Sequence, residues 1–304
     1  MLSSVIADNE RFRTIIDRLS EKSVDDYYNP YQMFRWPDTL PADMWWMSPH
    51  LTTFAGTDLA DELSEQQQRA VSRYESINFY SLNVHGIREL LVEVTRRIHT
   101  RGYESASEFF HHFIGEENEH MWFFAEFCLR YGGKIYTAPR GGASVPRSDE
   151  VETLLVFARI LIFEELVDYF NSTMERDDSL HETIRLVNRI HHQDETRHIA
   201  FGRELVSLLY RDLRRTATTD DLAFVDHYLE RYIRYSFESL FNPRVYADAG
   251  LTDPLQVRNR LLRAHENSDF RHRIFRKPRS FLEKTGILAG RVLAEEPAGR
   301  QEAR

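Results

Sequence analysis

The feature that most constrains this 304-residue chain is a pair of Glu-x-x-His motifs, Glu117 to His120 and Glu195 to His198. Residues three apart lie on one face of a helix, so each motif directs a carboxylate and an imidazole to the same point. Two such helices, joined by one glutamate from each of two further helices, form the ligand set of a dinuclear iron or manganese site in a four-helix bundle. The motifs therefore predict such a site, and two more glutamates must complete it.

Four long helices are predicted from the hydrophobic periodicity and the capping residues. They run over about 65–100, 105–131, 149–176 and 180–214. Ser64 and Gln67 have the spacing of a capping box at the start of the first helix, and Ser105 or Ser107 is expected to cap the second. Short turns join the helices within each pair, and the loop from Lys134 to Arg147 crosses between the pairs. This pattern predicts an all-α, ferritin-like four-helix bundle.

We expect a single domain over residues 1–304, because no linker separates the two motifs. Its parts are a core at about 62–214, an N-terminal wrap at 1–61 and accessory C-terminal helices at 215–293. Accessory helices are predicted at about 6–21, 220–241 and 255–284, and a frayed tail at 294–304. The proline- and tryptophan-rich stretch at 29–56 is expected to wrap the core, with a lid over a site as the alternative.

Glu89 is the predicted ligand on the first long helix. In two antiparallel helices, residues at the same height lie equally far from the turn that joins them. With the turn at Gly102, Glu117 should lie beside about residues 86–88 of the first helix. Glu89 is the acidic residue nearest to that level. Glu75 lies about four turns away, roughly 20 Å at 1.5 Å per residue, and is expected on a solvated face or in an outer sphere.

The third long helix offers Glu164, Glu165 and Asp168 as candidates. Arg159 is expected on the solvent-exposed face of this helix. Glu164 lies about 140° from Arg159 around the helix and Glu165 about 120°. We therefore take Glu164 as the ligand and keep Glu165 as the alternative.

A third imidazole comes from His191, which lies one turn before Glu195 on the same helix face. The predicted metal ligands are thus Glu89, Glu117, His120, Glu164, His191, Glu195 and His198. Four carboxylates would balance two Fe(II) ions, and Mn or a mixed Fe/Mn centre suits the same donors. Glu116 and Asp194 are expected to accept the second N–H of the opposite pair's imidazole. Phe113 and Phe124 are expected near the metals, in the core or lining a substrate cavity.

Charge and composition narrow the classes of function. The formal net charge of −9, without a dense run of Lys or Arg, argues against a nucleic-acid partner. The single cysteine, Cys128, excludes an internal disulfide framework and suits a reducing compartment. No signal-peptide pattern and no run of 18 apolar residues is present, so we expect a cytoplasmic protein that does not insert into a membrane.

The sequence resembles the p-aminobenzoate N-oxygenase (AurF-like) family of ferritin-like diiron proteins. The resemblance rests on Glu117-x-x-His120 and on His191-x-x-x-Glu195-x-x-His198, and it spans about residues 50–210. By this resemblance the lone glutamates correspond to Glu164 and Glu89. It implies O2-dependent oxidation of an amine to the hydroxylamine and nitro levels through a peroxo-diferric species, with two irons, O2 as co-substrate and an external electron donor. The resemblance does not identify the substrate or the oligomeric state, and a homodimer is one alternative.

Three other functions compete with this interpretation. A diiron C–H hydroxylase or desaturase would use the same ligands, and a ferroxidase-type iron-handling protein would only oxidise Fe(II). A ribonucleotide reductase small subunit is disfavoured, because that family needs a tyrosine where this chain has Phe124.

We predict two metal ions per chain, and we expect both Glu117→Ala and Glu195→Ala to lower that number. Each variant removes a carboxylate that no neighbouring residue replaces. Metal analysis of the purified proteins checks this, and retention of two irons by both variants would refute the ligand assignment.

Overall fold

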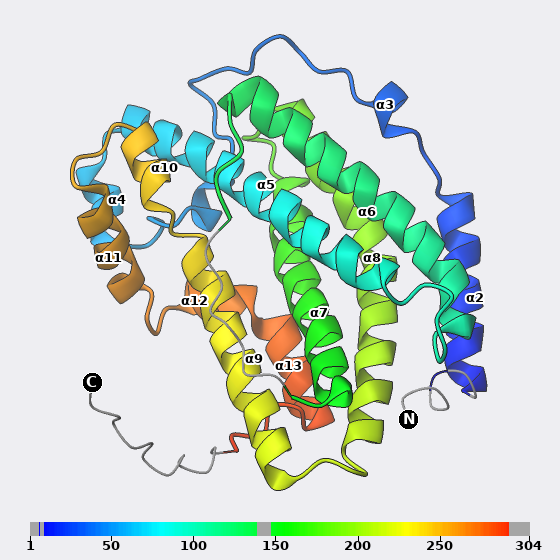
Figure 1. Ribbon diagram of the computed structural model, residues 1–304. Coiled ribbons are helices and arrows are strands. Elements are labelled where there is room, and N and C mark those ends of the chain that lie inside the picture. The colour runs from blue at the N-terminus through cyan, green and yellow to red at the C-terminus, as the bar shows by residue number, and fades with distance from the viewer. Residues whose placement is uncertain (1–5, 7–8, 139–146, 292–304) are drawn as a thin grey trace, which may run out of the picture.

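The computed structural model describes residue 6, residues 9–138 and residues 147–291. Over these residues its regular secondary structure is helical, apart from one isolated bridge between Trp45 and Leu180. Four long helices form the centre, namely α5 (Glu65–Thr95), α6 (Ser107–Phe127), α7 (Asp149–Met174) and α8 (Glu182–Leu213). α5 packs mainly on α6 and α7 mainly on α8 (Figure 1). The predicted all-α four-helix bundle is confirmed.

The two capping predictions had different outcomes. At the start of α5 the Ser64 hydroxyl accepts from the backbone N–H of Gln67, and the Gln67 side chain accepts from the N–H of Ser64, so the capping box is confirmed. The predicted serine cap of α6 is wrong. α6 follows a 3-10 turn at Glu104–Ala106 and has no side-chain cap, because the Ser107 hydroxyl donates to the carbonyl of Tyr103 and accepts from the N–H of His99.

A π-helical segment, Cys128–Gly132, ends the second long helix. Gly133 follows with φ +66°, a left-handed conformation that glycine adopts without strain. Gly132 lies against the buried side chain of Ile77 on α5. A Cβ at Gly132 would come within 2.9 Å of three Ile77 carbons. The two helices of the first pair therefore touch closely at this end.

The N-terminal part wraps α6 and α8. α2 (Glu10–Asp25) packs on both helices, starting later and ending later than predicted. The short helices α3 (Pro30–Met33) and α4 (Asp58–Glu62) and a 3-10 turn at Pro49–Leu51 follow. Between them Phe34 packs on Phe123 of α6, with ring centroids 5.2 Å apart. These contacts favour a wrap over a lid.

The C-terminal part covers α7. α9 (Thr219–Ser239) and α13 (Arg276–Thr285) both pack on it. The helix expected at 255–284 is instead three helices. The first break lies where His265 bonds to the Thr53 carbonyl and Ser268 caps the start of the next helix. The second break lies at Phe275. The remaining helices here are α10 (Pro243–Asp248), α11 (Pro254–Ala264) and α12 (Asp269–Ile274). The tail predicted to fray, 294–304, lies outside the described residues. No described helix is long and apolar enough to cross a membrane.

We expect Gly132→Ala to lower the free energy of unfolding by about 1–3 kcal/mol, because the new methyl group overlaps the buried Ile77 side chain. Gly115→Ala, in α6, is the matched control. Its Cβ meets nothing within 4 Å, and alanine should stabilise the helix by about 0.5–1 kcal/mol. Urea denaturation followed by circular dichroism measures both, and equal midpoints for the two variants would contradict the close packing.

Candidate metal centre

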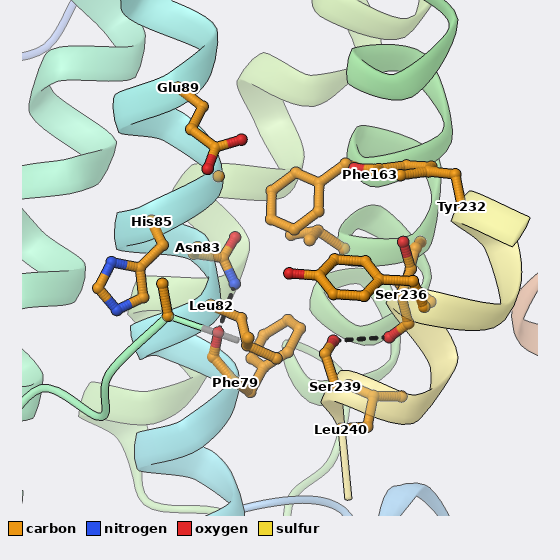
Figure 2. A pocket seen from close by; sticks show the side chains of 15 residues that line it. Phe79, Leu82, Asn83, His85, Glu89, Phe163, Tyr232, Ser236, Ser239 and Leu240 are labelled. Carbon is orange, nitrogen blue, oxygen red and sulfur yellow. Dashed lines mark hydrogen bonds between the residues drawn. The ribbon is translucent and has the colours of Figure 1, made fainter. Parts of the chain in front are cut away.

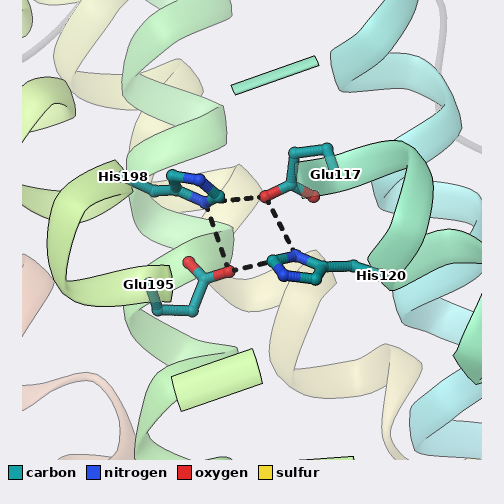
Figure 3. A group of neighbouring side chains, drawn as sticks. All are labelled: Glu117, His120, Glu195 and His198. Atoms are coloured by element: carbon teal, nitrogen blue, oxygen red, sulfur yellow. Dashed lines mark ion pairs between the residues drawn. The ribbon is translucent and has the colours of Figure 1, made fainter. Parts of the chain in front are cut away.

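Four side chains from α6 and α8 meet in the middle of the bundle (Figure 3). They are Glu117, His120, Glu195 and His198, and one donor atom from each lies within 4.8 Å of the others. His198 Nδ1 lies 2.7 Å from Glu117 Oε1 and 3.5 Å from Glu195 Oε1. His120 Nδ1 lies 3.4 Å from Glu117 Oε1. All four are buried. Because α6 and α8 cross here, the two Glu-x-x-His faces oppose each other.

Two further predicted ligands lie at this cluster. His191 Nε2 is 3.1 Å from Glu195 Oε1. The carboxyl of Glu164, on α7, interacts with those of Glu195 and Glu117. The alternative, Glu165, points elsewhere, because its carboxylate accepts from Arg203 at 2.8 Å. Of the two adjacent glutamates, Glu164 is therefore the one directed at the cluster.

These six residues have the property expected of metal ligands. Eight of their buried nitrogen and oxygen atoms have no hydrogen-bond partner outside the cluster, which is costly unless another group satisfies them. The atoms are Glu117 Oε1 and Oε2, His120 Nδ1, Glu164 Oε1, His191 Nε2, Glu195 Oε1 and Oε2, and His198 Nδ1. Carboxylate oxygens and imidazole nitrogens suit iron and manganese. The residues thus fit a bound dinuclear metal group.

The outer ring nitrogens of the two motif histidines bond crosswise. His120 Nε2 lies 2.9 Å from Asp194 Oδ2, and His198 Nε2 lies 2.7 Å from Glu116 Oε2. With Nε2 of each ring bonded to an acid, Nδ1 is the nitrogen that would face a metal. The predicted crosswise contacts of Glu116 and Asp194 are confirmed.

Sequence reasoning missed the groups that hold these acids. Arg197 Nη2 donates to Glu116 at 2.7 Å and to Asp194 at 2.6 Å, and its Nη1 donates to Asp26 of the N-terminal part at 3.2 Å. Tyr28 donates to Asp194 at 2.9 Å. Arg197 lies within the second motif, but its burial and its contacts with Glu116 and Asp26 depend on other segments, so no signal in the sequence indicated this role.

His191 is oriented by Asn171 of α7, whose amide contacts His191 Nδ1. The amide group can present either its oxygen or its nitrogen to the ring. With the oxygen facing the ring, Nδ1–H donates to it, the unpartnered Asn171 Oδ1 is satisfied, and Nε2 keeps its lone pair. This orientation is the one that lets His191 serve as a ligand.

Burial and close opposite charges shift the pKa values of the cluster. Burial alone would lower the pKa of His120, but Glu117 and Asp194 raise it to about 10. In the same way Glu195, Glu116 and Glu117 hold the pKa of His198 well above its usual range. Burial lowers the pKa of His191 to about 4. Burial and the carboxylates of Glu195 and Glu117 raise the pKa of Glu164 well above its usual value.

The structure does not bring the seventh predicted ligand, Glu89, to the cluster. Its side chain is exposed and lines a cavity between α5, α7 and α9, beside Phe163 and Tyr232 (Figure 2). The reflection through the turn found the right level, but Glu89 lies about 160° around the helix from the buried Ile87. Glu75, expected on a solvated face or in an outer sphere, is instead buried away from the cluster and accepts from the N–H of Thr53 at 3.1 Å.

Two phenylalanines pack on the imidazoles. Phe113 lies edge-on to His198 with centroids 4.4 Å apart, and Phe124 lies 4.9 Å from His191. Both are buried, and neither lines the cavity of Figure 2. They shield the cluster from water.

Residues 9–286 match the family described as P-aminobenzoate N-oxygenase AurF. The chain belongs to the AurF family. No curated protein matches it. Members of the AurF family are diiron N-oxygenases, so the protein is an oxidoreductase with a ferritin-like fold, and its buried Glu/His cluster fits the family's diiron site.

We expect metal binding at pH 7 to release protons. The raised pKa values of His120, His198 and Glu164 favour the protonated forms in the metal-free protein, whereas the lowered pKa of His191 favours its neutral form. Affinity should therefore fall as the pH is lowered. Anaerobic calorimetry with Co(II) in Tris and in PIPES measures the released protons, and a binding enthalpy independent of buffer would contradict these protonation states.

Proposed function

We propose that the protein is a diiron monooxygenase that uses O2 to oxidise a small arylamine at nitrogen, to a hydroxylamine or nitro product. The observation that carries this proposal is the convergence of six buried residues with unpartnered donor atoms in a chain of the AurF family. An external electron donor is part of the proposal, because reducing O2 in this reaction consumes electrons. The single domain over 1–304 and the reducing compartment also remain proposals.

The ligands that would hold the two irons are Glu117, His120, Glu164, His191, Glu195 and His198. When bound, the irons would supply the activation of O2. The chain's own groups keep the imidazoles in the correct tautomer through Asp194 and Glu116 and exclude water with phenylalanine rings. His191 adds a neutral donor, so it fills a coordination position without changing the charge.

The cavity in Figure 2 supports a small aromatic substrate. Its cavity volume is about 80 Å³, and its mouth is open to solvent. Its walls carry the rings of Phe79, Phe163, Tyr232 and Tyr235, with serine hydroxyls of α9 between them. Aromatic walls with a few polar groups suit a flat single-ring molecule. Phe163 directly precedes Glu164, so one wall of the cavity belongs to the helix turn that carries a proposed ligand.

The test compares the adjacent glutamates of α7. Iron-loaded wild-type protein, given O2, a chemical reductant and either aniline or 4-aminobenzoate, should form hydroxylamine or nitro product, detected by mass spectrometry. Glu164→Gln should lower the rate by at least about 100-fold, because a ligand is lost. Glu165→Gln, the matched control, loses only its bond to Arg203 and should keep most of the activity.

His191→Ala should keep much of its iron, since five ligands remain, and lose N-oxygenation. Products oxidised only at carbon would favour a hydroxylase or desaturase. Equal losses in the two glutamate variants would remove Glu164 from the ligand set.

A further inference from the structure

The α5 side of the metal centre has no carboxylate. α5 is described over its whole length, and its one buried acid is Glu75, which bonds to Thr53. The other three bundle helices supply Glu117, Glu164 and Glu195 to the cluster. A dinuclear site of this kind ordinarily takes a glutamate from each of the four helices. This chain therefore departs from that pattern by one negative charge.

The contacts of Tyr80 show which part of α5 faces the centre. Its ring stacks on Phe124 at 5.1 Å, and its hydroxyl accepts from Asn188 at 2.7 Å. Phe124 lies one turn beyond His120, and Asn188 lies nearly one turn before His191. One further turn along α5 therefore reaches the level of these two histidines.

At that level the buried α5 residues are Asn83 and Val84, and Ile87 follows one turn later. Asn83 is the polar one. Its side chain has no exposed surface, and its Nδ2 donates to the carbonyl of Phe79 at 2.8 Å. Its Oδ1 has no partner, although it is buried. A neutral amide oxygen thus stands on the core side of α5 where the pattern has a carboxylate.

Asn83 also lines the cavity between α5, α7 and α9 (Figure 2). It lies about 40° around the helix from Phe79, on the cavity side, and about 60° from Tyr80, on the core side. Asn83 is therefore at the boundary between the cavity and the bundle interior.

We propose that the α5 side of the centre is a binding position for a small exogenous carboxylate, next to Asn83. This rests on the proposed dinuclear site. Two Fe(II) carry four positive charges and the three glutamates three negative ones, so the filled site keeps one buried positive charge. Such a charge is costly unless an anion neutralises it, and a carboxylate is a hard donor that suits iron. Asn83→Asp supplies that charge from the chain with an isosteric side chain.

The test uses Co(II) as the metal probe and acetate as the anion. Metal-free protein is titrated anaerobically with Co(II), with either acetate or chloride at equal ionic strength, and the visible absorption of bound Co(II) is recorded. For the wild type, acetate should tighten the second Co(II) several-fold and shift its absorption bands. Asn83→Asp should bind the second Co(II) at least about tenfold more tightly without acetate, and acetate should add little.

Two controls separate this effect from general charge. Leu82→Asp puts the same charge on the wall of the same cavity but away from the core side, and it should not tighten the second ion. Glu89→Gln should leave both affinities unchanged, because Glu89 is exposed. Asn83→Ala, which removes the amide oxygen without adding charge, should keep the acetate effect. This variant keeps the test decisive if Asn83→Asp does not fold.

The outcomes distinguish the two proposals. A wild type that binds fewer than two Co(II) per chain overturns the proposed dinuclear function itself. Two Co(II) ions with no acetate effect, or an Asn83→Asp variant that behaves like Leu82→Asp, overturns only the carboxylate position.

Discussion

The structure depends on keeping ionisable groups in the dry centre of a helical bundle. A buried charge is tolerated only when it is paired and hydrogen-bonded. Here each motif contributes both a ligand pair and the acid that bonds the other motif's imidazole, so α6 and α8 are tied together through His120 with Asp194 and through His198 with Glu116. Arg197 lies between the two acids and neutralises charge that would otherwise repel. These hydrogen bonds and ion pairs hold the imidazoles of the proposed metal ligands in place, and none of them involves a metal.

This network gives the N-terminal part a role beyond covering apolar surface. Arg197 bonds to Ser23 and Asp26 at the end of α2, and Tyr28 bonds to Asp194. The residues before the bundle therefore complete the outer shell of the centre. Deleting them would expose Arg197 and leave Asp194 with fewer donors, so the wrap belongs to the same cooperative unit as the bundle core.

Features that depend only on helical spacing within one segment could be predicted from the sequence. The two motifs, His191, the crosswise role of Glu116 and Asp194, and the capping box at Ser64 are all local patterns of three or four residues. The prediction of Glu89 used only the distance of each residue from the turn. That distance gives the height of a residue along the helix axis but not the direction in which its side chain points around the axis. The direction was readable in part, since Tyr80, Val84 and Ile87 form the apolar face and Glu89 lies opposite. Arg197 and Asn171 could not be placed, because their roles depend on partners from distant helices.

The two flanks of the bundle, α6/α8 and α5/α7, differ in the side chains that they place around the centre. On the α6/α8 flank, α2 packs on both helices, and Arg197 pairs with the two acids that contact the ligand imidazoles. On the α5/α7 flank, α5 brings an amide and aliphatic side chains, and α9 covers a half-open cavity. The charge network and the cavity are thus on opposite flanks of the bundle. Because α5 contributes no buried carboxylate to the cluster, the α5/α7 flank is the side on which we propose that a small exogenous carboxylate binds.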